Sequence, residues 1–153
     1  MTFKLHTGGL ILMSNFEILT NKFPNVRIEG NKVFADNLIE VLEFLKNTSE
    51  FDFDMLTSIV AIDLESQIQL IYQLFSSKNN EALEVVYNVQ NCAPTVTSVY
   101  KSAYFEECEI YDLFGVDFDG NENLKRLFMP ESWIGHPLLK SYKMSDERLV
   151  WND

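Results

Sequence analysis

Carboxylate side chains are the first candidates for chemistry, because Glu106, Glu109 and Asp112 recur at every third position of one segment. If residues 103–114 form a helix, this spacing places the three carboxylates in a drifting row along it. Two carboxylates can act as the acid and base of a hydrolase, but the pair needs a cleft and a neighbour that tunes its pKa. A single helix face provides neither, so we expect no catalytic site.

The same row needs a source of positive charge. Like charges at this spacing destabilise an isolated helix by about 0.2–0.5 kcal/mol per pair, and an anion near a helix C-terminus also opposes the helix dipole. Lys125 and Arg126 are nearby cations in the sequence. Three arrangements remain open: a solvated acidic face, pairing of Asp112 with a cation of this chain, or pairing across an interface.

Histidine and cysteine are too few for a metal or redox centre. His6, His136, Cys92 and Cys108 are the complete set, and no Cys-x-x-Cys pair is present. Structural zinc sites need four such ligands, so we predict no metal site and incidental thiols in a reducing compartment. His136 precedes Pro137 in backbone that must be extended, where we expect it to contact backbone or a partner.

The composition is that of an acidic, folded chain. Its 153 residues carry a formal net charge of −11, and 46% of them are hydrophobic, which is enough for one domain with a core. This negative field makes nucleic acid and anionic lipid poor partners, whereas a basic protein surface would be attracted. No apolar run approaches the about 18 residues that span a bilayer, so we expect a soluble chain that meets a membrane only through a complex.

No regular structure is predicted for the first thirteen residues. Met1–Leu12 has neither the basic start of a signal peptide nor a helical period, and Ser14 is a good N-cap for a helix that begins after Met13. The codons of the Gly-Gly pair upstream can also read as a ribosome-binding sequence. We therefore expect residues 1–13 to be an over-annotated or disordered leader, which an intact native mass that includes them would contradict.

Hydrophobic periodicity predicts the order helix, strand, strand, helix, strand, strand, strand. Gly30-Asn31 turns a hairpin, and Asp36 caps the second helix. The second helix carries one apolar stripe, formed by Leu38, Val41, Leu42 and Leu45. The strand at residues 53–63 is apolar on both faces in its second half, as expected of a central strand. The strands at 67–75 and 83–89 alternate apolar and polar residues.

This order predicts an α+β fold, a two-layer sandwich of a mixed sheet with helices on one face. We assign the sandwich to residues 14–100. A short helix at 103–114 follows, closed by Gly115 in the left-handed conformation. Long irregular segments are usually functional or bound to a partner. We therefore predict that residues 101–153 form a short helix plus an extended subunit-docking tail.

Two motifs occupy this tail: Glu107-Cys-Glu-Ile-Tyr-Asp-Leu-Phe-Gly and Gly135-His-Pro-Leu-Leu-Lys-Ser-Tyr, with Leu124-Lys-Arg between them. In order and spacing they resemble the C subunit of bacterial NADH:quinone oxidoreductase, which is respiratory complex I. The mitochondrial iron–sulfur protein 3 subunit belongs to the same family. The likeness runs without a gap over about a quarter of the chain, and the preceding element order agrees with it.

Several positions depart from the family pattern. Cys108 and Leu139 stand where the family has arginine, Asn121-Glu122 where it has His-Pro, and Ser141 where it has aspartate. Lys125 replaces the first of two arginines and loses the guanidinium fork. We expect the partner surfaces to differ accordingly, or the chain to serve a membrane-bound hydrogenase or a ferredoxin-, F420- or formate-linked complex.

The resemblance implies a cofactor-free subunit of the peripheral arm on the cytoplasmic side of the bacterial membrane. FMN and iron–sulfur clusters would belong to partner subunits. The expected partners are the D subunit, which helps form the quinone site, the B subunit, which holds the terminal cluster, and other peripheral-arm subunits. The assembly would pass electrons from NADH to quinone and move protons, while this chain has no catalytic or metal-binding residues of its own.

The resemblance also implies a set of docking residues in this chain. By position in the motifs they are Glu107, Glu109, Tyr111, Asp112, Gly115, Arg126, Gly135, Pro137 and Lys140. Trp133 and Tyr142 join them, because large aromatic side chains in an irregular tail, with Phe128 among them, are typical interface anchors. The equal alternative for these aromatic side chains is to cap the core. The alternative from another class is a stand-alone protein-binding module, which would be a monomer with a tail that is ordered by itself.

Overall fold

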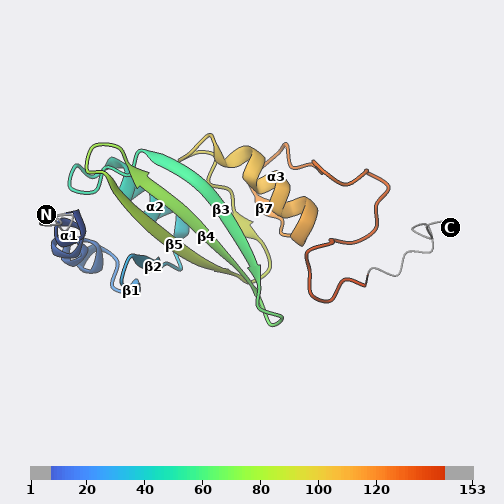
Figure 1. The fold of residues 1–153 in the computed structure, drawn as a ribbon, viewed down its shortest axis with the longest axis horizontal. Coiled ribbons are helices and arrows are strands. Elements are labelled where there is room, and N and C mark those ends of the chain that lie inside the picture. The colour runs from blue at the N-terminus through green and yellow to red at the C-terminus, as the bar shows by residue number, and fades with distance from the viewer. Residues whose placement is uncertain (1–7, 144–153) are drawn as a thin grey trace, which may run out of the picture.

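The computed structural model describes residues 8–143, with side chains from Asn15 onward (Figure 1). Three helices are present in this range: α1 (Gly8–Lys22), α2 (Leu38–Asn47) and α3 (Ala103–Phe114). The main strands are β1 (Arg27–Glu29), β2 (Lys32–Phe34), β3 (Met55–Asp63), β4 (Ile68–Ser76) and β5 (Glu81–Val89). A short separate pair is formed by β6 (Ala93–Pro94) and β7 (Phe118–Asp119).

The five main strands form one mixed sheet in the order β1-β2-β5-β4-β3. β2 runs parallel to β5, and the other neighbours pair antiparallel. The parallel pair requires a crossover, which α2 begins, and α2 lies behind β4 and β5 in Figure 1. The predicted α+β class, mixed sheet and two-layer arrangement are confirmed.

The core lies between α2 and the sheet. The apolar stripe of α2 is confirmed, because Leu38, Val41, Leu42 and Leu45 are each no more than 1% exposed. Alternation is confirmed in β4, where Leu70, Tyr72 and Leu74 are buried and the residues between them are half-buried. In β5, Leu83, Val85 and Val89 are buried on the same side. Period-2 burial on one face and a helical stripe opposite it define the two layers.

The prediction for the start of the first helix is wrong. α1 begins at Gly8, so Ser14 lies inside the helix and is not its N-cap. Nothing in the apolar segment before Ser14 stops a helix, and a mid-helix serine costs only a few tenths of a kcal/mol, about 0.5 relative to alanine. The predicted leader therefore includes helical residues from Gly8, and residues 1–7 lie outside the described range.

The cap predicted for α2 is also wrong. Asn37, not Asp36, is the N-cap, and its side chain makes no capping hydrogen bond. The Val41 N–H instead bonds to the Asn37 carbonyl at 3.1 Å, as the first helical bond. Asp36 lies one residue too early to reach the free N–H groups of the first turn.

The prediction that β3 is a central strand is wrong. β3 is the last strand of the order and pairs only with β4. On the side of the sheet away from the core, Val60 and Ile62 are 39% and 38% exposed. An apolar pattern on both faces is typical of a strand buried on both sides, but strand order depends on pairing with distant segments, which a local pattern does not record.

The helix α3 and its closure are confirmed. α3 ends where the Gly115 N–H bonds to the Tyr111 carbonyl, and Gly115 has a φ of 72°. The chain then pairs β7 with β6 and continues through turns to residue 143 without another helix or longer strand. Over the described residues, no helix combines the length and apolar character needed to cross a membrane.

Candidate docking site

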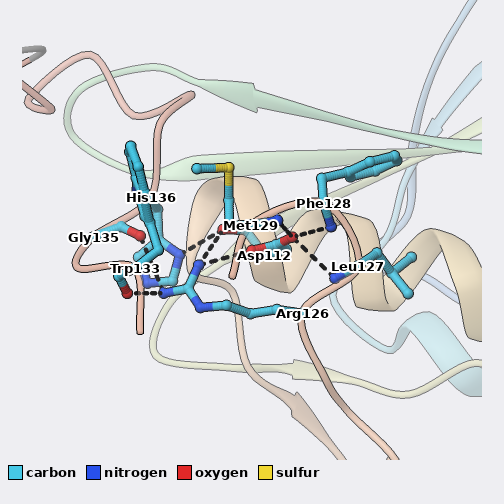
Figure 2. A network of polar contacts seen from close by, with 8 residues as sticks. All are labelled: Asp112, Arg126, Leu127, Phe128, Met129, Trp133, Gly135 and His136. Carbon is cyan, nitrogen blue, oxygen red and sulfur yellow. Dashed lines mark hydrogen bonds and ion pairs between the residues drawn. The ribbon is translucent and has the colours of Figure 1, made fainter. Parts of the chain in front are cut away.

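The site centres on Asp112, whose side chain is fully buried on the last turn of α3. One carboxylate oxygen accepts a hydrogen bond from Arg126 Nη1 at 2.7 Å. The other accepts three backbone N–H groups in succession, from Leu127 at 3.0 Å, Phe128 at 2.7 Å and Met129 at 2.9 Å (Figure 2). The Asp112 side chain therefore pairs with the charge of Arg126 and also holds the backbone of the three residues that follow it.

Arg126 extends this network back across the tail. Its Nη1 also donates to the Asp112 carbonyl, and its Nη2 donates to the carbonyls of Trp133 and Gly135, all at 3.2 Å. His136 Nδ1 lies 2.9 Å from the same Asp112 carbonyl. Residues 126–136 thus close into a loop on the end of α3 (Figure 2). The expectation that His136 contacts backbone is confirmed.

The electrostatics of Asp112 follow from these contacts. Burial by itself raises the pKa of the Asp112 carboxyl, because removal from water disfavours the charge. The backbone N–H groups of the tail and the Arg126 guanidinium outweigh that effect, and the pKa lies below its ordinary value. Of the three arrangements open for Asp112, the structure shows pairing within the chain.

Glu107 makes a second buried link with a different character. Its side chain is 0% exposed and accepts hydrogen bonds from Thr95 Oγ1 at 2.7 Å, Val96 N at 2.8 Å and Asn121 Nδ2 at 2.8 Å. No lysine or arginine of the described chain forms an ion pair with it. Burial therefore raises the pKa of Glu107 despite its three donors. The carboxylate ties the ends of β6 and β7 to α3.

The other carboxylates of α3 have separate surroundings. Glu106 accepts the Ile59 N–H of β3 at 3.3 Å, which attaches α3 to the edge of the sheet. Glu109 is exposed to solvent. Tyr111 is half-buried, with its ring centroid 6.3 Å from that of His136. The expected row of three thus splits into an edge contact, a solvated residue and the buried Asp112.

Two glycines of the site are required by close approach. A Cβ on Gly115 would lie 2.6 Å from His136 Cδ2, and one on Gly135 would lie 2.9 Å from Tyr142 Cε2. Both residues have positive φ, 72° and 88°. A larger residue at either position would meet a ring and a strained backbone together. These glycines let the tail pack on itself and on α3.

The remaining predicted residues hold the far end of the tail. The Lys140 N–H donates to Asp63 at 2.8 Å, and its ammonium lies 3.3 Å from Glu65, so the tail reaches the β3–β4 turn. The Lys140 N–H lowers the pKa of Asp63. Pro137 is half-buried, between His136 and Leu138. The structure brings nine of the eleven predicted residues into or beside one connected loop, while Glu107 and Glu109 stand apart from it.

The largest opening described beside the tail is bordered by charged side chains that already have partners. A cleft of about 720 Å³ opens between the β3–β4 turn and the tail, lined by polar and apolar residues. Of its charged side chains, Lys140 pairs with Glu65, and Asp63 accepts the Lys140 backbone N–H. Within the described range, no group of three or more metal-ligating side chains is placed to hold an ion. What the arrangement does is hold an irregular segment in one conformation.

Sequence reasoning missed two features of the site. Asn121, which departs from the family pattern, donates to Glu107, so a polar side chain is still used there. Ile134 was passed over as a docking residue, yet it is 80% exposed on a loop with fixed backbone. Its apolar type inside an irregular segment was the available signal.

Comparison with known protein families identifies the family of the chain. Residues 32–148 match the model of the "Respiratory-chain NADH dehydrogenase, 30 Kd subunit" family. The chain belongs to this 30 kDa subunit family. The resemblance carried by the tail motifs is thereby confirmed, and it extends well beyond them into the sheet.

Relatives within the 30 kDa subunit family are identical to the chain at about a third of the aligned positions. The C subunit of the NADH-quinone oxidoreductase of Geobacter metallireducens is 33% identical over 119 residues, which are 73% of this chain and 72% of that protein. A C/D subunit of the same enzyme from a Sulfurihydrogenibium species is 37% identical over 132 residues, which are 80% of this chain but only 23% of that longer protein.

A solved structure supports the fold of the family member. A chain of the membrane-bound sulfane sulfur reductase, an archaeal respiratory membrane complex, matches with a TM-score of 0.69 over 87% of this chain and 86% of that one. The sequence identity is 23%, so this likeness establishes the architecture alone.

Proposed function

We propose that the chain is the C subunit in the peripheral arm of a proton-translocating NADH:quinone oxidoreductase. In this role it holds the D-type subunit, which helps form the quinone site, and lies near the B subunit and other arm subunits on the cytoplasmic side of the membrane. It carries no cofactor, and FMN and iron–sulfur clusters belong to its partners. Its contribution to electron transfer is structural.

One observation carries this proposal: the tail has a fixed backbone and exposed apolar side chains. The Phe128 N–H donates to buried Asp112, while the Phe128 ring is 64% exposed. Ile134 is 80% exposed between two residues whose carbonyls bond to Arg126. A free chain gains nothing by presenting such groups to water, whereas an interface gains from anchors that are ordered before binding.

The choice of the D-type subunit as partner is supported by the relatives. In the Sulfurihydrogenibium protein, the region similar to this chain is part of one C/D polypeptide. Two modules joined in one chain stay at high effective concentration, which suits modules that bind each other. The same pairing between separate chains is what we propose for this protein.

The experiment is a mild-detergent purification of the tagged chain from native membranes, with its partners identified by mass spectrometry. We expect the D-type and B-type subunits together with the flavin- and cluster-bearing NADH dehydrogenase subunits. A nickel hydrogenase large subunit in their place would move the chain to a related complex. Recovery of the chain alone, at the same yield, would favour a stand-alone binding module and contradict the proposal.

A further inference from the structure

The helix α3 presents its side chains in four rows, each of which repeats at every fourth residue. One row is buried in the fold, because Ala103 and Glu107 are both 0% exposed. The next row lies against the edge of the sheet, where Glu106 accepts the Ile59 N–H of β3 at 3.3 Å. The other two rows differ from each other in what covers them.

The tail covers the third row of α3. Tyr104 Oη donates to the Asn123 carbonyl at 3.3 Å, and Cys108 Sγ lies 3.8 Å from the same oxygen. One turn further along the row, Asp112 binds Arg126 and three backbone N–H groups of the tail. This row is therefore closed by an irregular segment that brings a cation and N–H donors to the carboxylate beneath it.

The fourth row, formed by Phe105, Glu109 and Leu113, is the open one. Phe105 is 65% exposed, Glu109 is exposed, and Leu113 is half-buried. The row of a helix that faces water normally carries polar side chains, whereas two of these three are large and apolar. The neighbouring row holds the backbone of Phe128 at Asp112, and the Phe128 ring is 64% exposed. The open row therefore borders the tail directly and shares its exposed apolar character.

Glu109 determines the chemistry of whatever covers this row. It lies one turn from Phe105 and one turn from Leu113, so a surface that covers both also covers its carboxylate. Within the part of the chain that the structure describes, neither Glu109 nor the nearby tail cation Lys125 forms an ion pair. Burial of a carboxylate without a cation is strongly unfavourable. The cover therefore has to bring a lysine or arginine together with apolar side chains.

We propose that the open row of α3 binds a basic segment of the D-type subunit. A lysine or arginine of that segment pairs with Glu109, and apolar side chains beside it pack on Phe105 and Phe128. The inference rests on the proposed function, because it extends the docking surface proposed there from the tail to α3. The formal net charge of −11 also favours approach of a basic segment over an acidic one.

Photo-crosslinking identifies what covers the row. Phe105 is replaced by p-benzoylphenylalanine, which keeps its aromatic character, and the exposed Ile18 of α1 is replaced in the same way as the matched control. Each tagged chain is irradiated in native membranes, and the crosslinked partner is identified by mass spectrometry. We expect an adduct with the D-type subunit from position 105 and no such adduct from position 18.

Charge reversal tests the ion pair. Glu109→Lys is compared with Glu43→Lys, at an exposed position of α2, by the amount of D-type subunit that co-purifies from native membranes. We expect a loss of at least tenfold with Glu109→Lys and recovery within twofold of wild type with Glu43→Lys. Glu109→Gln should lose less than Glu109→Lys. Its recovery should also depend less on salt than that of wild type, because salt screens an ion pair.

Thermal unfolding of the isolated variants separates docking from folding. The substituted side chains are exposed, so each melting temperature should lie within about 3 °C of wild type. Equal recovery of the D-type subunit with Glu109→Lys and Glu43→Lys would overturn the inference, and the proposed function would survive. An adduct of position 105 with a second copy of the chain or with another subunit, or no adduct at all, would also overturn the inference alone. A wild-type chain that recovers no D-type subunit would overturn both.

Discussion

The carboxylate of Asp112 and the guanidinium of Arg126 meet at 2.7 Å, with the Asp112 side chain fully buried and the Arg126 side chain 16% exposed. This pair joins the last turn of α3 to the start of the tail loop. Because the second oxygen of Asp112 also holds three tail N–H groups, the tail conformation depends on this one residue. The effects of substitution should be largest here among the acidic residues of α3.

Asp112→Asn should destabilise the chain strongly. The substitution keeps the shape of the side chain but leaves the Arg126 charge without its partner in a largely buried site. Removal of one member of a buried pair costs about 3–5 kcal/mol. Urea denaturation followed by circular dichroism measures the free energy of unfolding. Glu109→Gln, an exposed position on the same helix, is the control and should change it by less than about 0.5 kcal/mol. Equal midpoints for the two variants would refute the role of the pair.

The tail loop should open in acid because of Asp112. Its pKa is lowered in the folded chain, so its stabilising effect is complete above the unfolded value of about 3.9 and is lost as the pH falls through the folded pKa. Hydrogen exchange of the Leu127, Phe128 and Met129 amides, corrected for intrinsic rate, should show protection that falls below about pH 4. In Asp112→Asn this protection should be weak at every pH. Identical profiles for the two chains would contradict the assignment.

Glu107 should have the opposite pH dependence. Its pKa is raised, so the folded chain binds the proton more tightly than the unfolded chain. The stability contribution is therefore complete below the unfolded value of about 4.3 and is lost as the pH rises through the folded pKa. Glu107→Gln removes this loss and keeps an acceptor for the Val96 N–H. We expect its unfolding free energy to match or exceed that of wild type at pH 8 and to fall below it at pH 4. A pH-independent difference would rule out the buried charge as the cause.

Gly115→Ala should disturb the site through His136. The added methyl group would lie 2.6 Å from the His136 ring and would sit on a backbone with φ of 72°. Left-handed backbone alone costs a non-glycine residue about 1–2 kcal/mol. Gly30→Ala is the matched control, because φ is 62° there and nothing lies within 4 Å of the new atom. We expect Gly115→Ala to be the more destabilising in urea, with a displaced His136 ring resonance by NMR. Equal losses of stability in the two variants would show that the His136 ring moves aside at no energetic cost.

Local patterns predicted much of the fold and part of the site. The α2 stripe, the strand alternation and the closure of α3 at Gly115 each follow from spacing within one element. The β3 position did not, because strand order depends on pairing with distant segments. The hydrogen bonds that occupy its edge come from Ser102 and Glu106, which lie 46 and 47 residues after their partners in β3. The start of α1 was missed because a good N-cap residue is also tolerated inside a helix.

The sequence left the partner of Asp112 open for a physical reason. Arg126 is fourteen positions away on an irregular segment, and no periodicity fixes where such a segment folds back. The burial of Glu107 was harder to predict, because a helix rich in carboxylates indicates a solvated face. A carboxylate that is buried without a cation has no signal in the neighbouring sequence. α3 also buries Ala103 and Ile110 in the common core, so a truncation that tests docking has to leave α3 in place.

The most direct test of the docking account is the amount of D-type subunit that co-purifies with a chain whose tail anchors are removed. Phe128→Ser combined with Ile134→Ser alters two exposed side chains and leaves the backbone contacts of the loop intact. The account predicts an unchanged melting temperature and a loss of at least tenfold in the D-type subunit recovered from native membranes. Recovery equal to wild type from the correctly folded double variant would contradict it.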